Sequence, residues 1–236
     1  DNHPDEFLVY TIYAESLLKK QKLNEARTAL LKALSIEQND YMLWERVLFI
    51  DNDLQDWNGL YKHSKEVVEL FPNQPQGYFM NAVACVQLEK FDETILITDE
   101  GIDFVIDNPQ LKGNFLMLKG EAEYKNNRKK EAFELFDEAV KLDPDNYITM
   151  NNYAYYLSLD GGDLDKAERM SGKVIERFPD NATYLDTYAW VLFKKGEYSL
   201  AKFYMDSAIK NGGEENATLL EHYGDILFKL KKLDEA

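Results

Sequence analysis

The residues able to carry chemistry are few and scattered through the sequence. Its three histidines, His3, His63 and His222, lie far apart, with no cysteine or second histidine at the spacing of a metal-ligand set. We interpret His63, which follows Tyr61 on an expected helix, as a residue of the surface or of a groove edge. The sequence therefore predicts no metal site.

The single cysteine, Cys85, excludes an internal disulfide framework. Its neighbours Ala84 and Val86 are small and apolar, and nothing nearby in the sequence indicates an activating base. We therefore expect Cys85 to be a small buried hydrophobic residue.

Glycine and asparagine motifs indicate turns and helix starts. The pair Gly161-Gly162 falls in an expected turn and does not follow a strand, so it is no phosphate-binding loop, and the sequence has no Gly-x-Ser-x-Gly motif. Two segments match the glycosylation sequon, beginning at Asn181 and Asn216. Both fall where helices are expected to begin, so we interpret these asparagines as helix caps. The sequence predicts no enzyme and no bound cofactor.

The charge balance is strongly acidic. The 236 residues include 43 acidic and 27 basic side chains, which gives a formal net charge of -16. Such a chain should repel nucleic acid and anionic membrane surfaces, and no segment is apolar enough to insert into a membrane. The acidity suits a basic or neutral partner, and it is equally a common way for a protein to stay soluble.

A repeat of about 34 residues positions these side chains. In each unit a polar turn precedes the second helix, and a residue near the start of that helix is expected to pack against the first helix. From one unit to the next, this residue recurs after 34, 34, 38, 35, 34 and 35 residues. The residues at these places are Ala26, Leu60, Thr94, Ala132, Ala167, Ala201 and Ala236. A period of this size is typical of two helices per unit.

The closing sequence of each unit identifies the family. From Ala139 to Asn146 the residues Ala-Val-Lys-Leu-Asp-Pro-Asp-Asn closely resemble the end of the second helix in the tetratricopeptide repeat family. Similar endings precede Pro72 and Pro179. The family's small first-helix residue appears as Ala14, Ala82, Gly120, Ala154, Ala189 and Gly224. Small side chains allow the two helices to approach closely, and the apolar faces of one hairpin are buried only when hairpins stack.

The resemblance implies an all-α, right-handed superhelical solenoid similar to the long bacterial members of the family. We expect a single solenoid over residues 7–236, with repeats at about 7–40, 41–74, 75–112, 113–146, 147–181 and 182–216 and a partial repeat over 217–236. The partial repeat should supply one helix, from Leu220 to Leu230, with further repeats or a cap following in a longer parent chain. Four extra residues near Ile106–Gln110 predict a lengthened second helix or loop in the third unit.

The resemblance also implies that the first helices line a concave groove. The stripe that should face a partner includes Thr11, Glu15, Glu45 and Phe49, and its expected binding residues are Phe79, Val83, Met117, Glu121, Asn151, Asn152, Tyr155, Asp186, Trp190, Glu221 and Asp225. Tyr155 and Trp190 are the expected aromatic anchors. Phe79 and Val83 have an alternative interpretation, since they could pack between neighbouring repeats, and the same alternative stays open for Tyr155 and Trp190.

The expected function is that of a non-catalytic protein–protein interaction scaffold that holds a peptide or helix of a partner. Some members of the family bind chaperone C-termini through a basic clamp, but acidic residues such as Glu15, Glu45 and Glu121 oppose that activity here. Two alternatives stay open: a structural or self-assembling module, with contacts through the C-terminal helix, and a regulatory arm of an enzyme whose catalytic domain lies elsewhere. The bacterial style of the repeats favours the periplasm or cell envelope, with the cytoplasm as the alternative.

Overall fold

The computed structural model describes residues 4–231, and all regular structure in that range is helical. Thirteen α-helices and one short 3-10 helix follow one another along the described chain. They divide into two compact units, Asp1–Leu142 and Asp143–Ala236. The predicted all-α class and the pattern of six hairpins followed by one helix are confirmed. A single continuous solenoid over residues 7–236 stays a prediction.

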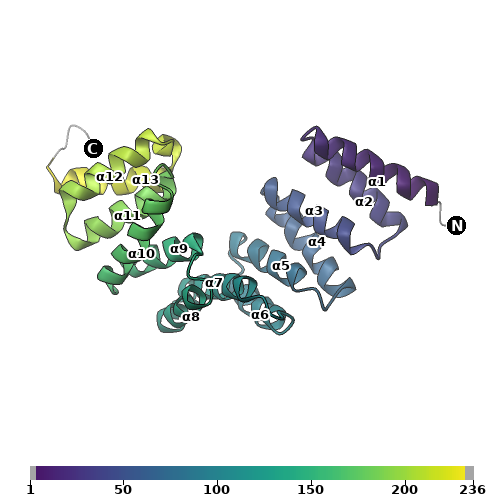
Figure 1. The fold of residues 1–236 in the computed structure, drawn as a ribbon, viewed down its shortest axis with the longest axis horizontal. Coiled ribbons are helices and arrows are strands. Elements are labelled where there is room, and N and C mark those ends of the chain that lie inside the picture. The colour runs from purple at the N-terminus through teal and green to yellow at the C-terminus, as the bar shows by residue number, and fades with distance from the viewer. Residues whose placement is uncertain (1–3, 232–236) are drawn as a thin grey trace. The chain divides into compact units, whose positions relative to one another are not determined.

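Unit 1 consists of four helical hairpins stacked in chain order (Figure 1). Its helices are α1 (Pro4–Lys19), α2 (Leu23–Ile36), α3 (Tyr41–Asp53), α4 (Trp57–Leu70), α5 (Pro75–Gln87), α6 (Phe91–Ile102), α7 (Pro109–Lys125) and α8 (Lys129–Leu142). Odd-numbered helices are the first helices of their hairpins, and even-numbered helices are the second.

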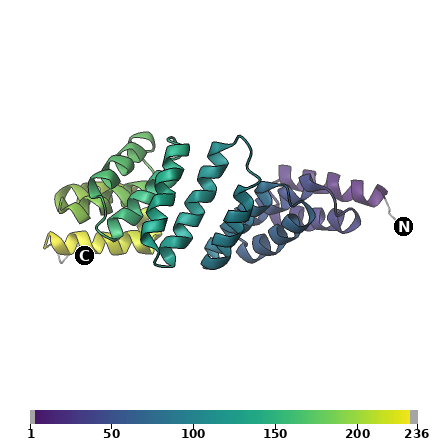
Figure 2. The same ribbon diagram turned by 90° about the horizontal axis from the view of Figure 1, so that it is seen from below.

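Unit 2 contains two hairpins and a further first helix. Its elements are α9 (Tyr147–Leu159), α10 (Leu164–Arg177), α11 (Ala182–Lys195), α12 (Tyr198–Lys210), η1 (Gly213–Glu215) and α13 (Ala217–Lys229). Helix α13, drawn in yellow in Figure 2, packs against α11, α12 and η1. It begins three residues before the expected Leu220. His3 and the last repeat segment, Lys232–Ala236, lie outside the described residues.

Asparagine and aspartate caps begin most first helices. The side chains of Asp40, Asn108, Asn146, Asn181 and Asn216 each accept a hydrogen bond from the backbone N–H three residues later. These bonds satisfy N–H groups that the helix itself leaves without partners. The interpretation of Asn181 and Asn216 as caps rather than as glycosylation signals is thus supported by their geometry.

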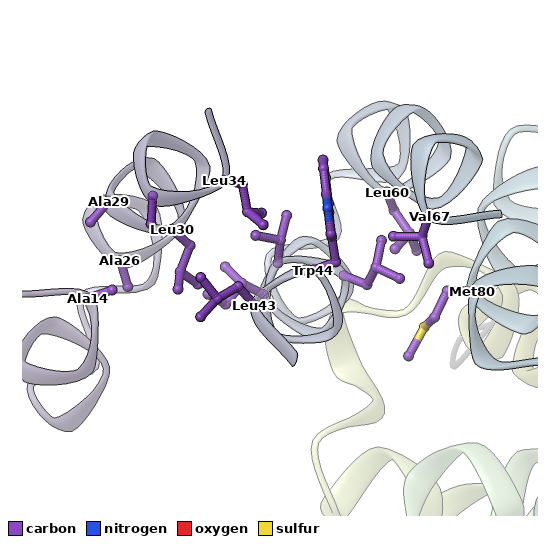
Figure 3. Packing of buried hydrophobic residues seen from close by; sticks show 14 of the residues in the cluster. Ala14, Ala26, Ala29, Leu30, Leu34, Leu43, Trp44, Leu60, Val67 and Met80 are labelled. Carbon is purple, nitrogen blue, oxygen red and sulfur yellow. The ribbon is translucent and has the colours of Figure 1, made fainter. Parts of the chain in front are cut away.

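Small residues lie where paired helices cross. Ala14 on α1 faces Ala26 on α2, and both are fully buried (Figure 3). At Gly120 in α7 an added Cβ would lie 3.3 Å from the carbonyl oxygen of Ala132 in α8 and 3.3 Å from the ring of Phe136. The repeat arithmetic therefore identified the places where the two helices of a hairpin approach most closely.

The turn inside each hairpin needs one residue with a left-handed backbone. In unit 1 this residue is Gln21, Gln55, Glu89 or Asn127, with φ between 54° and 63°. In unit 2 the corresponding places are occupied by Gly161 and Gly196. Glycine adopts this conformation without the steric cost that a Cβ imposes, so the turns of unit 1 carry a strain that those of unit 2 avoid.

The four extra residues of the long repeat do not lie where the sequence suggested. Helix α7 begins 18 residues after α6 begins, just as α5 begins 18 residues after α4, so the end of the third repeat has ordinary length. Instead α7 has 17 residues, whereas α5 and α9 have 13. The loop between α6 and α7 has six residues against four between α4 and α5, but α6 is two residues shorter than α4, so the expected net lengthening near Ile106–Gln110 is wrong. Asn108 caps α7 and Pro109 begins it, which moves the boundary four residues ahead of Lys112.

Candidate functional site

The predicted groove residues of unit 1 are mostly engaged in packing. Phe79, Val83 and Met117 pack against a buried cluster of Ala82, Val86 and Leu118 between α5 and α7. The ring of Phe79 also makes an edge contact with Phe115, with 5.5 Å between ring centroids. For Phe79 and Val83 the structure favours the alternative of packing between repeats. Glu121 is half-buried, and a partner-binding role for these four residues stays a prediction.

A more exposed apolar surface lies on α1 and α3. Its members are Leu8, Ile12, Met42 and Phe49, which are 55%, 58%, 66% and 45% exposed. Arg46 lies four residues after Met42 and three before Phe49, and it forms an ion pair with Glu15, which lies three residues after Ile12. Since residues three and four apart share a helix face, this ion pair brings the two apolar stripes together. We call these four residues the first-helix patch.

In unit 2 the predicted residues form two rows across α9, α11 and α13. One row contains Asn151, Asp186 and Glu221, and the other contains Tyr155, Trp190 and Asp225, each at steps of 35 residues. Contacts of α11 with both α9 and α13 place the rows side by side on the first helices. The structure thus brings these predicted residues together.

Trp190 lies in the interior of unit 2 rather than on an open groove wall. It is only 6% exposed, and its indole stacks on His222 of α13 with 3.9 Å between ring centroids and on Phe193 with 4.8 Å. Lys194 covers the indole at 4.8 Å from the ring centroid. The expectation that Trp190 is an exposed anchor is wrong, because α13 packs over it.

His222 connects the two rows. Its Nδ1 lies 2.8 Å from Oδ1 of Asp186, and both side chains are buried. Its ring also lies 6.1 Å from that of Tyr155. Tyr155 is half-buried, and burial raises its pKa, with the nearby carboxylates of Asp186 and Glu221 raising it further. Tyr155 is therefore the aromatic ring that remains accessible beside acidic groups.

The two asparagines differ in their surroundings. Asn151 is 5% exposed, and its Oδ1 has no hydrogen-bond partner among the described residues. Its Nδ2 lies 3.5 Å from Oδ1 of the half-buried Asn152. Glu221 and Asp225 are exposed, and neither forms an ion pair with a described residue.

His63 is buried, which contradicts its interpretation as a surface residue. Its Nδ1 lies 2.6 Å from Oδ2 of Asp51, and Oδ1 of Asp51 accepts a hydrogen bond of 2.5 Å from Arg27. Arg27 also donates to Asp56, the cap of α4. The amide N–H of Gly59 and the Arg27 guanidinium hold the pKa of Asp56 below its ordinary value. These side chains join α2, α3 and α4, and their arrangement is structural.

Other chemistry is limited in the described part of the chain. No group of three or more His, Cys, Asp or Glu residues there could hold a metal ion. None of the described helices is long and apolar enough to cross a membrane. Cys85 is fully buried as expected, and burial raises the pKa of its thiol to about 11.

Sequence profiles described as tetratricopeptide repeat match the chain in three places, residues 8–40, 113–146 and 135–169. The first two matches coincide with repeats that the spacing predicted, and each covers one hairpin. The chain is a tetratricopeptide repeat protein. No curated protein sequence matches it.

Solved structures share the fold of this tetratricopeptide repeat protein. A tetratricopeptide repeat protein from Parabacteroides merdae is 15% identical, with a TM-score of 0.75 over 98% of this chain and 89% of the other. PilW, a type IV pilus biogenesis factor, is 15% identical, with a TM-score of 0.72 over 91% and 97%. YrrB, described as having an unusual peptide-binding site, is 18% identical, with a TM-score of 0.55 over 84% and 98%. At these identities the likeness concerns the fold alone.

Sequence reasoning missed three residues of the first-helix patch, Leu8, Ile12 and Met42. The groove stripe was begun at Thr11 in α1 and at Glu45 in α3, and Leu8 and Met42 lie three residues before these places on the same helix face. Extending the stripe by one turn towards the N-terminus of each helix finds Leu8 and Met42, and Ile12 lies one turn after Leu8 on the same face. Ile148 occupies the same place in α9 and is also exposed.

Proposed function

We propose that this tetratricopeptide repeat protein binds an apolar peptide segment of a partner protein on the first-helix patch of unit 1. Its fold is that of protein-interaction scaffolds, and a protein of similar fold, YrrB, is described as having a peptide-binding site. The proposal concerns the place and chemistry of binding.

The observation that supports it is the uneven distribution of exposed apolar side chains. Among the described residues, ten of the large exposed hydrophobic side chains lie on first helices and three on second helices. Leu8 and Ile12 lie on α1 and Met42 and Phe49 on α3, and the Glu15–Arg46 ion pair joins these two helix faces. Contiguous apolar surface is costly to leave in water, so it commonly marks a site where another molecule binds.

The side chains of the patch suit an apolar segment of a partner. Met42 is unbranched and flexible, so it can adapt to different side chains, and Phe49 offers a rigid ring. The Glu15–Arg46 ion pair lies between the stripes and gives a polar edge that can orient a bound backbone. Apolar anchors beside a polar rim are the usual anatomy of a protein interface.

A peptide-selection experiment tests the proposal. Peptides are selected from a displayed library on the purified chain, and their affinities are measured for the parent and for Met42→Ser/Phe49→Ser. We expect enrichment of apolar peptides whose affinity falls more than about tenfold in this variant, since one anchor residue contributes about 2 kcal/mol or more.

The matched control is Leu96→Ser/Phe203→Ser, which removes two side chains of similar exposure, 64% and 61%, from the second helices α6 and α12. Circular dichroism verifies that both double variants are folded. Peptides that bind the parent should bind the control variant within about twofold. Selection of no peptide, or an equal loss in both variants, would contradict the proposed surface.

A further inference from the structure

The rows of unit 2 converge on a site around Tyr155. Tyr155 projects from α9, Asp186 from α11, and Glu221 and Asp225 from α13. The contacts of His222 with Tyr155 at 6.1 Å and with Asp186 at 2.8 Å place these two residues beside α13, and the carboxylate of Glu221 also acts on Tyr155. We call Tyr155, Asp186, Glu221, Asp225 and Asn151 the Tyr155 site.

The two carboxylates that α13 contributes to this site are not engaged by cations of the described residues. Glu221 and Asp225 form no ion pair with a described residue, and they lie one turn apart on the same face of α13. Lys194 is held over the indole of Trp190 at 4.8 Å. The site therefore presents carboxylates that a bound cation could pair with.

The ring of Tyr155 also differs from several other tyrosine rings of the chain, over which the charged group of a lysine lies. Lysine ammonium groups lie over the rings of Tyr10, Tyr61 and Tyr147, at 5.4, 3.8 and 5.6 Å from the ring centroids. No lysine or arginine among the described residues lies over Tyr155. Because the face of an aromatic ring attracts cations, the ring and the carboxylates favour the same kind of ligand.

Asn151 supplies a second, independent observation, a buried hydrogen-bond acceptor that has no donor among the described residues. It lies one turn before Tyr155 on the same face of α9, and its buried Oδ1 accepts no hydrogen bond from a described residue. A buried acceptor without a donor is unfavourable, so an N–H group delivered by a ligand would stabilise it. The site thus favours a cation with N–H donors. A guanidinium stacks on an aromatic ring and directs five N–H donors in a fixed plane, so it suits the ring and two carboxylates together better than a lysine ammonium does.

We propose that the Tyr155 site binds an arginine side chain of a partner protein, with the guanidinium against the ring of Tyr155 and its N–H groups towards Glu221 and Asp225. The proposal rests on the proposed function only in taking the ligand to be part of a protein. The overall charge of -16 favours the approach of such a basic segment.

The direct test uses N-acetyl-arginine amide as the probe. It is titrated into the full chain carrying isotope-labelled tyrosine, and the Tyr155 ring signal is assigned with Tyr155→Phe. We expect a saturable shift of this signal with the arginine amide and none with the citrulline amide, which has the same shape without the charge. In Glu221→Gln/Asp225→Asn the apparent affinity should fall about tenfold.

The control is Glu214→Gln/Glu215→Gln, which removes the same charge from two exposed residues of η1. It should change the arginine affinity less than twofold, so that a general loss of negative charge is separated from the loss of this site. Equal shifts with both amides, an unmoved Tyr155 signal, or equal losses in both double variants would overturn the proposal.

These outcomes are separate from those for the first-helix patch. A Tyr155 shift with arginine amide supports the arginine site even when no peptide is selected in the earlier experiment, a result that would count against the proposed function alone. Selected peptides that depend on Met42 and Phe49, together with an unmoved Tyr155 signal, would overturn the arginine site alone.

Discussion

Replacing Trp190 with alanine should loosen α13 from α11, because the buried indole of α11 stacks on His222 of α13. Truncating a buried tryptophan typically costs about 3–5 kcal/mol. The indole Nε1 is buried without a hydrogen-bond partner among the described residues, and removing such a group recovers about 1–3 kcal/mol. The expected net loss is therefore about 2 kcal/mol.

Hydrogen exchange resolved by helix is the appropriate assay, since repeat proteins open locally and one global midpoint can miss a change at one end. A loss of about 2 kcal/mol corresponds to exchange of protected α11 and α13 amides that is about 30-fold faster. Amides of α5 and α6 in unit 1 should be unaffected.

Two further variants separate the contribution of the Trp190 ring from that of its Nε1 group and compare Trp190 with Tyr155. Trp190→Phe keeps a ring against His222 and removes the unpartnered Nε1, so it should differ from the parent by less than about 1 kcal/mol. Tyr155→Ala should cost less than Trp190→Ala because Tyr155 is only half-buried. Unchanged exchange in α11 and α13 of Trp190→Ala would refute the conclusion that Trp190 is a core residue.

Four other changes test local features. Gln55→Gly should raise the free energy of unfolding by about 0.5–1 kcal/mol, measured by urea denaturation, because glycine relieves the left-handed turn residue at φ 54°. Gly101→Ala should lower the thermal midpoint clearly, because the new Cβ would lie 2.6 Å from Cβ of Tyr78; an unchanged midpoint would refute this close approach. The folded pKa of Asp56 lies below its ordinary value, so its contribution to stability is present at neutral pH and lost as the pH falls through the folded pKa; Asp56→Asn keeps a cap and should flatten acid denaturation in that range. Cys85, with a thiol pKa of about 11, should react with a thiol reagent at neutral pH only after denaturant is added.

The helix pattern could be predicted because it depends on local chemistry that recurs. Small residues such as Ala132 and Ala167, polar turns and the Asx caps specify a helix start, a crossing and a helix end within one unit. The repeat arithmetic failed at one place, where Asn108-Pro109 is itself a helix-start signal. The expected lengthening of a second helix or loop includes Pro109, whereas this proline begins the lengthened helix α7.

The sequence predicts the candidate site less completely than the helices. The position of a residue on a helix face indicates which residues point in the same direction, but it does not indicate which side chains of other helices pack over them. Tyr155 and Trp190 occupy equivalent places in successive repeats, yet one is half-exposed and the other is buried. The difference arises from His222, which reaches from α13 to stack on Trp190.

The sequence by itself therefore determined the helices, their pairing into hairpins and the small residues at their crossings, because each depends on contacts within about 34 residues of chain. Only the tertiary structure decided which members of each first-helix stripe stay exposed. Phe79 and Met117 are packed between α5 and α7, while Met42 and Phe49 are left open. The physical reason is that exposure of a side chain depends on the size and direction of side chains from the neighbouring repeat, which the pattern within one repeat does not contain.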